Sequence, residues 1–129
     1  MLYLVIDLVK KFKDETITIE TIKSDLIDEY KRLTTIPDEE NEGEFVINND
    51  RNTKIMDLIK DEGQYDANQI LKNAITVEHM ILQDGFNPVS FDLWILMNKY
   101  QIPSILISDT EIPETNRKRN EFVCYKGND

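Results

Sequence analysis

Apolar residues recur at helical spacing over much of the chain. Residues 1–12 are apolar on almost every side, which is typical of a helix that is buried all round. Residues 18–33 carry apolar side chains three and four positions apart, which predicts an amphipathic helix. Thr18 is a suitable N-cap for this helix, and Pro37 cannot continue it, so we expect it to end near Leu33.

Shorter helices are predicted further along the chain, at 53–62, 67–73, 76–85 and 90–100. Their expected N-caps are, in order, Asp50 or Asn52, Asp66, Thr76 and Ser90. The last of these helices is rich in apolar and aromatic residues, and Pro103 follows it closely. We therefore expect its side chains to belong to the core.

Two runs of apolar residues near the end of the chain predict strands, at 102–107 and 120–125. For the run 45–47 two interpretations stay open, a short strand and a packed loop. A helix that leads directly into a buried strand is typical of layered domains. The predicted fold class is therefore α/β (α+β), a small and mostly helical layer domain with a short sheet.

The length of 129 residues suits one domain, spanning 1–129. Five acidic residues between Pro37 and Phe45 indicate a solvated acidic linker near 37–50. The chain begins abruptly with an apolar helix, so we expect it to be one piece of a longer protein. No apolar run approaches the ~20 residues that a membrane helix needs, and no signal peptide is recognisable. We therefore expect an intracellular protein without a membrane partner.

The charge balance bears on the class of partner. The chain has 25 acidic and 15 basic residues, a formal net charge of -10. Binding to a nucleic-acid backbone needs clustered basic residues, and the compact cluster Arg117-Lys118-Arg119 is better interpreted as a solvated loop tip. The composition therefore predicts no nucleic-acid partner.

The sequence offers little for catalysis. Cys124 and His79 are the single cysteine and the single histidine. Cys124 falls in a predicted strand with no activating cation nearby, which favours a buried structural cysteine over a nucleophile. His79 falls on a short helix, where a partly exposed histidine without a catalytic role is the simpler interpretation. We expect no metal, because there is no second histidine, and no phosphate-binding loop, because the glycines are widely separated: Gly43, Gly63, Gly85 and Gly127.

The order of elements resembles the ovarian-tumour (OTU) family of cysteine proteases. The resemblance rests on an apolar first helix that opens with Met1-Leu2-Tyr3, and on a helix with Phe91-Asp92-Leu93-Trp94 that leads into the strand 102–107. Three short stretches are similar to OTU-like regions in large proteins of giant DNA viruses: Asp92-Leu93-Trp94, Lys99-Tyr100-Gln101-Ile102-Pro103 and Glu121-Phe122-Val123.

The chain departs from the OTU pattern at the catalytic positions. Met1 stands where the family has its nucleophilic cysteine, and a thioether cannot form a thiolate. No histidine follows Tyr125, where the family's catalytic histidine lies on a final strand. The resemblance therefore implies a degenerate domain that is not an enzyme.

What the resemblance implies is a non-catalytic OTU-like binding or assembly module of a large DNA virus, in the host cytoplasm or in the virion. Its expected partner is a protein, either ubiquitin or another viral protein. Two alternatives stay open. One is an active deubiquitinating protease that uses Cys124 or residues outside this segment, and the other is a purely structural virion protein.

Overall fold

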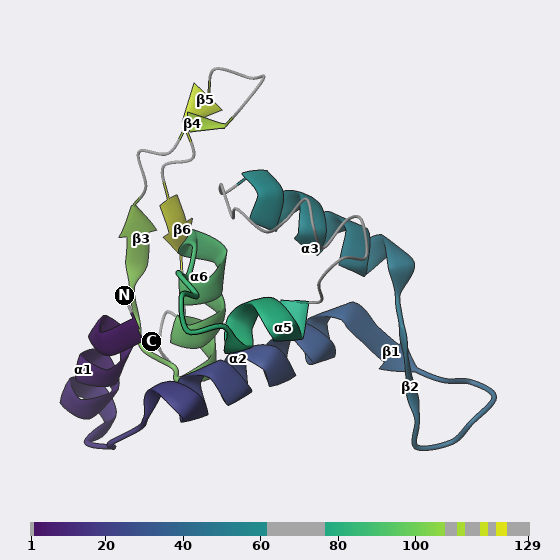
Figure 1. The fold of residues 1–129 in the computed structure, drawn as a ribbon, viewed down its shortest axis with the longest axis horizontal. Coiled ribbons are helices and arrows are strands. Elements are labelled where there is room, and N and C mark those ends of the chain that lie inside the picture. Colours follow the sequence, from purple (N-terminus) through teal and green to yellow (C-terminus); the bar gives the residue numbers. More distant parts are fainter. Residues whose placement is uncertain (1, 62–76, 108–110, 113–116, 119–120, 124–129) are drawn as a thin grey trace.

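The computed structural model describes residues 2–61, 77–107, 111–112, 117–118 and 121–123 (Figure 1). The elements are α1 (Leu2–Lys13), α2 (Ile19–Thr34), β1 (Thr35–Pro37), β2 (Phe45–Ile47), α3 (Asn49–Asp61), α5 (Val77–Leu82), α6 (Ser90–Lys99), β3 (Ile105–Ile107), β4 (Glu111–Ile112), β5 (Arg117–Lys118) and β6 (Glu121–Val123). The described part of the chain is mostly helical, with strands in short antiparallel pairs. It is a small α+β domain, which confirms the predicted fold class. The helix predicted at 67–73 lies outside the described residues.

Helix α2 organises the fold, because α1, α3, α5 and α6 all pack against it. The Thr18 side chain accepts a hydrogen bond from the Thr21 N–H at 3.1 Å, which confirms the predicted N-cap. The buried residues of α2 are Ile22, Leu26, Ile27 and Tyr30, so its apolar stripe faces the neighbouring helices as the spacing predicts. The core also contains Met56 and Ile59 of α3 and Met80 and Ile81 of α5.

Helix α6 is the most enclosed helix among those described. It packs against α2, β3 and β6, and its buried residues are Phe91, Asp92, Leu93, Ile95, Leu96 and Met97. The predicted cap at Ser90 is wrong: the helix begins at Ser90, and the Asp92 Oδ2 accepts the Val89 N–H at 2.8 Å. A carboxylate at the third helical position thus satisfies a free N–H group at the helix start.

The end of α6 has a well-defined geometry. Gln101 adopts a left-handed conformation with φ of 56°, and the Ile102 N–H donates to the Met97 carbonyl at 2.9 Å. This is the hydrogen bond of a Schellman motif, with glutamine in the place that glycine usually takes. The turn directs Ile102, which is 1% exposed, into the core ahead of β3.

The prediction that the first helix is buried all round is wrong. Only one side of α1 packs against α2, with Leu2, Val5 and Val9 buried. Tyr3 is 73% exposed and Leu4 is 50% exposed. The reason lies in the position of α1 at one end of α2, where no described element covers its outer side (Figure 1).

Both strands predicted near the end of the chain are present in shorter form. β3 and β6 pair antiparallel, with Ile105 opposite Val123. Ile105 is 61% exposed, so the prediction of a buried strand over 102–107 is only partly correct. The basic cluster predicted as a loop tip begins in a strand, since Arg117–Lys118 form β5 and pair with β4.

The acidic segment predicted as a solvated linker near 37–50 contains most of a hairpin and the start of α3. β1 and β2 pair antiparallel in the register Thr35 with Ile47 and Pro37 with Phe45. The acidic residues form the loop between the two strands, in which Gly43 has a φ of 85°. β-branched and aromatic residues on both sides of a turn favour this pairing.

Helix α3 begins directly after the hairpin, earlier than predicted. The Asn48 side-chain oxygen accepts the Arg51 N–H at 3.0 Å, so Asn48 takes the capping role expected of Asp50 or Asn52. The asparagine thus joins the end of β2 to the start of α3 without an intervening loop.

Candidate functional site

Of the three residues considered for catalysis, His79, Cys124 and Met1, the structure describes only His79. His79 lies on α5 and is exposed, as expected. Met1 and Cys124 lie outside the described residues, so the predicted lack of a Cys-His pair stays a prediction.

Within the described ranges, no group of three or more His, Cys, Asp or Glu side chains could hold a metal ion. Nor is any described helix both long and apolar enough to cross a membrane.

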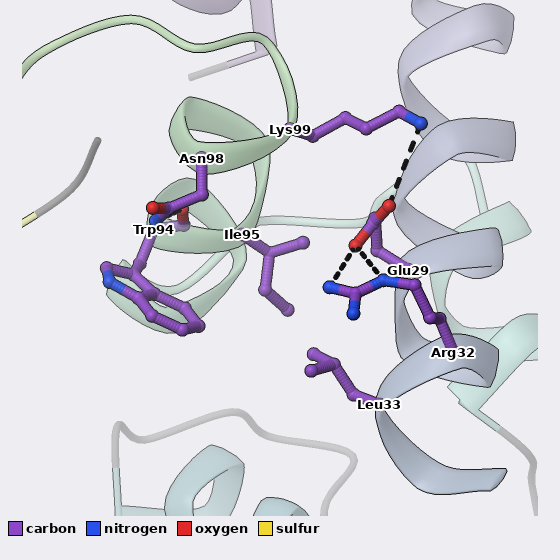
Figure 2. A pocket seen from close by; sticks show the side chains of 7 residues that line it. All are labelled: Glu29, Arg32, Leu33, Trp94, Ile95, Asn98 and Lys99. Atoms are coloured by element: carbon purple, nitrogen blue, oxygen red, sulfur yellow. Dashed lines mark hydrogen bonds and ion pairs between the residues drawn. The ribbon is translucent and has the colours of Figure 1, made fainter. Parts of the chain in front are cut away.

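A pocket of about 350 Å³ lies between α2 and α6 (Figure 2). It is lined by Glu29, Arg32, Leu33, Trp94, Ile95, Asn98 and Lys99. The Glu29 carboxylate lies between two cations: the Arg32 Nη2 is 2.8 Å from its Oε2, and the Lys99 Nζ is 3.7 Å from its Oε1. The Glu29 side chain is only 12% exposed, and this arrangement compensates its charge.

The aromatic side of this pocket is fixed by packing. The Trp94 ring stacks on Phe91, with ring centroids 5.5 Å apart and planes at 14°. The Asn98 Nδ2 donates to the Trp94 carbonyl at 2.6 Å. The lining contains no hydroxyl, thiol or imidazole group, and its carboxylate is already held by two cations. The described lining thus offers no hydroxyl, thiol or imidazole nucleophile, and the Lys99–Glu29 ion pair joins α6 to α2.

Two tyrosine–aspartate hydrogen bonds also join α2 to α6. The Tyr30 hydroxyl donates to the Asp92 Oδ1 at 2.5 Å, and the Tyr100 hydroxyl donates to the Asp25 Oδ2 at 2.7 Å. Burial, and then the Asp92 charge and hydrogen bond, raise the pKa of Tyr30 well above its usual value. Burial, followed by the hydrogen bond and charge of Asp25, likewise raises the pKa of Tyr100. Both hydroxyls therefore stay protonated at neutral pH and act as donors.

Asp92 is the single polar residue in the buried set of the described chain, at 1% exposed. Sequence reasoning used it only as part of a resemblance. The signal that points to it is one carboxylate within a mostly apolar helix, because a buried carboxylate needs donors. Its role is structural, since Tyr30 and the Val89 N–H occupy its two oxygens.

The β1–β2 hairpin differs from the contact between α2 and α6, because its apolar side chains are exposed. It projects from the end of α2 that lies away from α1, with its loop directed away from the helices (Figure 1). Its strand β2 exposes three consecutive large apolar residues: Phe45 at 66%, Val46 at 43% and Ile47 at 63%. The loop that precedes β2 carries five carboxylates, from Asp38, Glu39, Glu40, Glu42 and Glu44. The hairpin thus places an exposed apolar strand directly after an acidic loop.

The chain matches no family model, no curated protein and no solved structure. The resemblance to OTU proteases accordingly stays a prediction, and the candidate site rests on the geometry of the hairpin alone.

Proposed function

We propose that this chain is a non-catalytic protein-binding module and that the β1–β2 hairpin is its contact surface. The observation that carries the proposal is the exposure of Phe45, Val46 and Ile47 on a strand that no described element covers. Exposed large apolar side chains with polar residues around them are typical of protein interaction sites. Burial of such a patch in a complex would supply the hydrophobic part of the binding free energy.

The hairpin suits binding better than the pocket between α2 and α6. In the pocket, Arg32 and Lys99 are already paired with Glu29, so a charged ligand would have to compete with an internal ion pair. The apolar side chains of β2 face no such competition. The proposed function therefore depends on the hairpin and not on the pocket.

The test of this function is a comparison of three proteins. Each would be immobilised and exposed to an extract of the native source: the wild type, a hairpin variant with Phe45→Lys and Ile47→Lys, and a control variant with Tyr3→Lys and Leu4→Lys on α1. All four substituted residues are exposed, so each substitution should change the free energy of unfolding by no more than about 0.5 kcal/mol. Circular dichroism and thermal melting would verify that both variants fold.

We expect one partner protein that the wild type and the α1 control retain and that the hairpin variant loses. Purified partner would then be titrated calorimetrically against all three proteins. If the hairpin variant retains every partner with unchanged affinity, the contact surface lies elsewhere and the proposal is wrong.

The OTU resemblance makes the proposal more specific. It would make the chain a degenerate OTU-like module of a large DNA virus, in the host cytoplasm or the virion, with ubiquitin as the first partner to test. Ubiquitin would be titrated into the isotope-labelled chain and followed by NMR. Shifts confined to the amides around β2 would support ubiquitin as the partner. Unchanged spectra at high micromolar ubiquitin would exclude it and leave another viral protein as the expected partner.

A further inference from the structure

The two edges of the hairpin differ in what they offer to a further strand. The Asn48 N–H donates to the Thr34 carbonyl at 2.7 Å, and the Asp38 N–H donates to the Glu44 carbonyl at 2.9 Å. In an antiparallel ladder, every second residue pair exchanges hydrogen bonds. The two bonds above belong to pairs that lie two positions on either side of the pair Ile36 with Val46, so this pair exchanges hydrogen bonds too.

The residues on either side of Val46 therefore direct their backbone groups away from β1. These residues are Phe45 and Ile47, whose N–H and C=O groups point to the outer edge of β2. The backbone bonds around the hairpin give neither N–H group a partner within the described part of the chain. β2 thus presents two outward N–H groups and two outward C=O groups in a row, which is the pattern that an added strand would pair with.

The opposite edge of the hairpin is blocked. Pro37 occupies the matching outward position of β1 and has no N–H group to donate. Thr35, the other outward residue of β1, is the C-cap of α2, and its hydroxyl donates to the Lys31 carbonyl at 2.6 Å. A strand could therefore extend the hairpin on the β2 side only.

The side chains and charges at this edge define the chemistry of a partner. Phe45 and Ile47 share one face of the hairpin, Val46 occupies the other, and all three are exposed. The acidic loop, 38–44, contributes five carboxylates and no basic residue. A strand alongside β2 would thus meet apolar side chains along its length and negative charge at one end.

We propose that β2 adds a strand from a partner protein, and that this strand alternates apolar and basic residues. The apolar residues would pack beside Phe45 and Ile47, and the basic residues would compensate the acidic loop. This inference rests on the proposed function, because it specifies how the same hairpin binds. A second copy of the chain is a poorer occupant, since each copy has a net charge of -10 and would bring further negative charge to the edge.

The probe is a short synthetic peptide that alternates lysine with valine. Two control peptides carry glutamate in place of lysine, or N-methylated backbone amides on the pairing side. Binding to the full chain would be measured by calorimetry, and amide hydrogen exchange would be followed by NMR. A substituted protein, Glu42→Lys with Glu44→Lys, tests the charge contribution of the loop.

We expect the lysine peptide to bind and both control peptides to fail. At saturation, exchange at the amides of Phe45 and Ile47 should slow by at least about tenfold, while that of Val46, which is already paired with Ile36, should change little. The Glu42→Lys, Glu44→Lys protein should bind the lysine peptide roughly tenfold more weakly, equivalent to about 1.4 kcal/mol.

The other outcomes overturn this inference and separate it from the proposed function. Binding without protection at Phe45 and Ile47 would mean hydrophobic docking without strand addition. If the lysine peptide does not bind but the natural partner still needs the hairpin, the proposal of a basic strand is wrong and the proposed function still holds. Protection of both amides without peptide, together with concentration-dependent sedimentation, would show that the occupant is a second copy. Loss of all hairpin-dependent binding would refute the proposed function itself.

Discussion

The contact between α2 and α6 and the β1–β2 hairpin both contain carboxylates and aromatic rings, but they use them differently. Between the helices, Asp92 accepts from Tyr30, and Glu29 pairs with Arg32 and Lys99. In the hairpin loop, no ion pair involves the five carboxylates among the residues that the structure describes. Polar groups that have internal partners fit a role in folding. The exposed apolar side chains of β2 have no comparable role in the core, which is why we propose that they bind a partner.

The strongest test of this contrast is truncation of one apolar side chain in each region. Leu26→Ala, on the buried face of α2, should lower the free energy of unfolding by about 2–5 kcal/mol, because it leaves a cavity in the core. Phe45→Ala, at a residue that is 66% exposed, should change it by no more than about 0.5 kcal/mol. Urea denaturation followed by circular dichroism measures both values. Equal losses would show that the hairpin belongs to the cooperative core.

The next test removes one hydroxyl from each tyrosine–aspartate pair. Tyr30→Phe removes the donor to the Oδ1 of the buried Asp92 and should cost about 1–3 kcal/mol. Tyr100→Phe removes the half-buried bond to Asp25 and should cost only about 0.5–1.5 kcal/mol. Tyr3→Phe on the exposed side of α1 is the matched control and should have no measurable effect. A cost for Tyr30→Phe as small as that of the control would contradict the structural role of Asp92.

Much of the helical part could be predicted from the sequence, because its signals are local. Thr18 and Pro37 define both ends of α2 within a few residues, and the spacing of the apolar residues identifies the buried face. His79 was correctly placed on a short helix, as an exposed residue. In each case the residues that decide the outcome lie within one element or close to its ends, so their order along the chain is sufficient.

The features that could not be predicted depend on contacts between distant segments. Tyr30 and Asp92 are 62 positions apart, so nothing in the local pattern pairs them. The exposure of Tyr3 and Leu4 depends on which neighbours cover α1, and not on the composition of the helix. The acidic segment looked like a linker because charge dominates its composition. Whether the flanking strands pair is decided by their side chains and register, which composition does not report.

The two raised tyrosine pKa values predict a dependence of stability on alkaline pH. A phenol in the unfolded chain loses its proton near pH 10, whereas Tyr30 and Tyr100 hold theirs to higher pH in the folded chain. The folded state then binds more protons, so the free energy of unfolding is unaffected below about pH 10 and falls as the pH rises above it. Urea titrations from about pH 8 to about pH 11 should show this fall.

The slope should be smaller in a Tyr30→Phe, Tyr100→Phe protein, because the two substituted groups no longer titrate. Since lysines titrate over the same range, the difference between the slopes of the two proteins is the diagnostic quantity. Identical slopes would mean that neither tyrosine retains its proton through the α2–α6 contact.

The smallest effect is expected at Asp38, where the hairpin loop has its own internal order. The Asp38 Oδ1 accepts the Glu40 N–H at 3.0 Å, and its Oδ2 accepts the Asn41 Nδ2 at 3.0 Å. The bond from the Asn41 side chain, followed by that from Glu40, lowers the pKa of Asp38. The carboxylate therefore supports the loop above the unfolded pKa of about 3.9, and this support is lost as the pH falls through the lower folded value.

Asp38→Ala should speed amide exchange at Glu40 without moving the midpoint of global unfolding, because both hydrogen bonds of the Asp38 carboxylate stay within the loop. Asp38→Asn is the matched variant, since it keeps a side-chain oxygen for the Glu40 N–H and should retain most of the protection. NMR exchange rates of the two variants, compared at neutral pH, distinguish a locally ordered loop from one that is fixed by the core. A shift of the unfolding midpoint in Asp38→Ala would show that the loop contributes to the stability of the helical core. The distinction between a region that stabilises the fold and a hairpin that binds a partner would then be wrong.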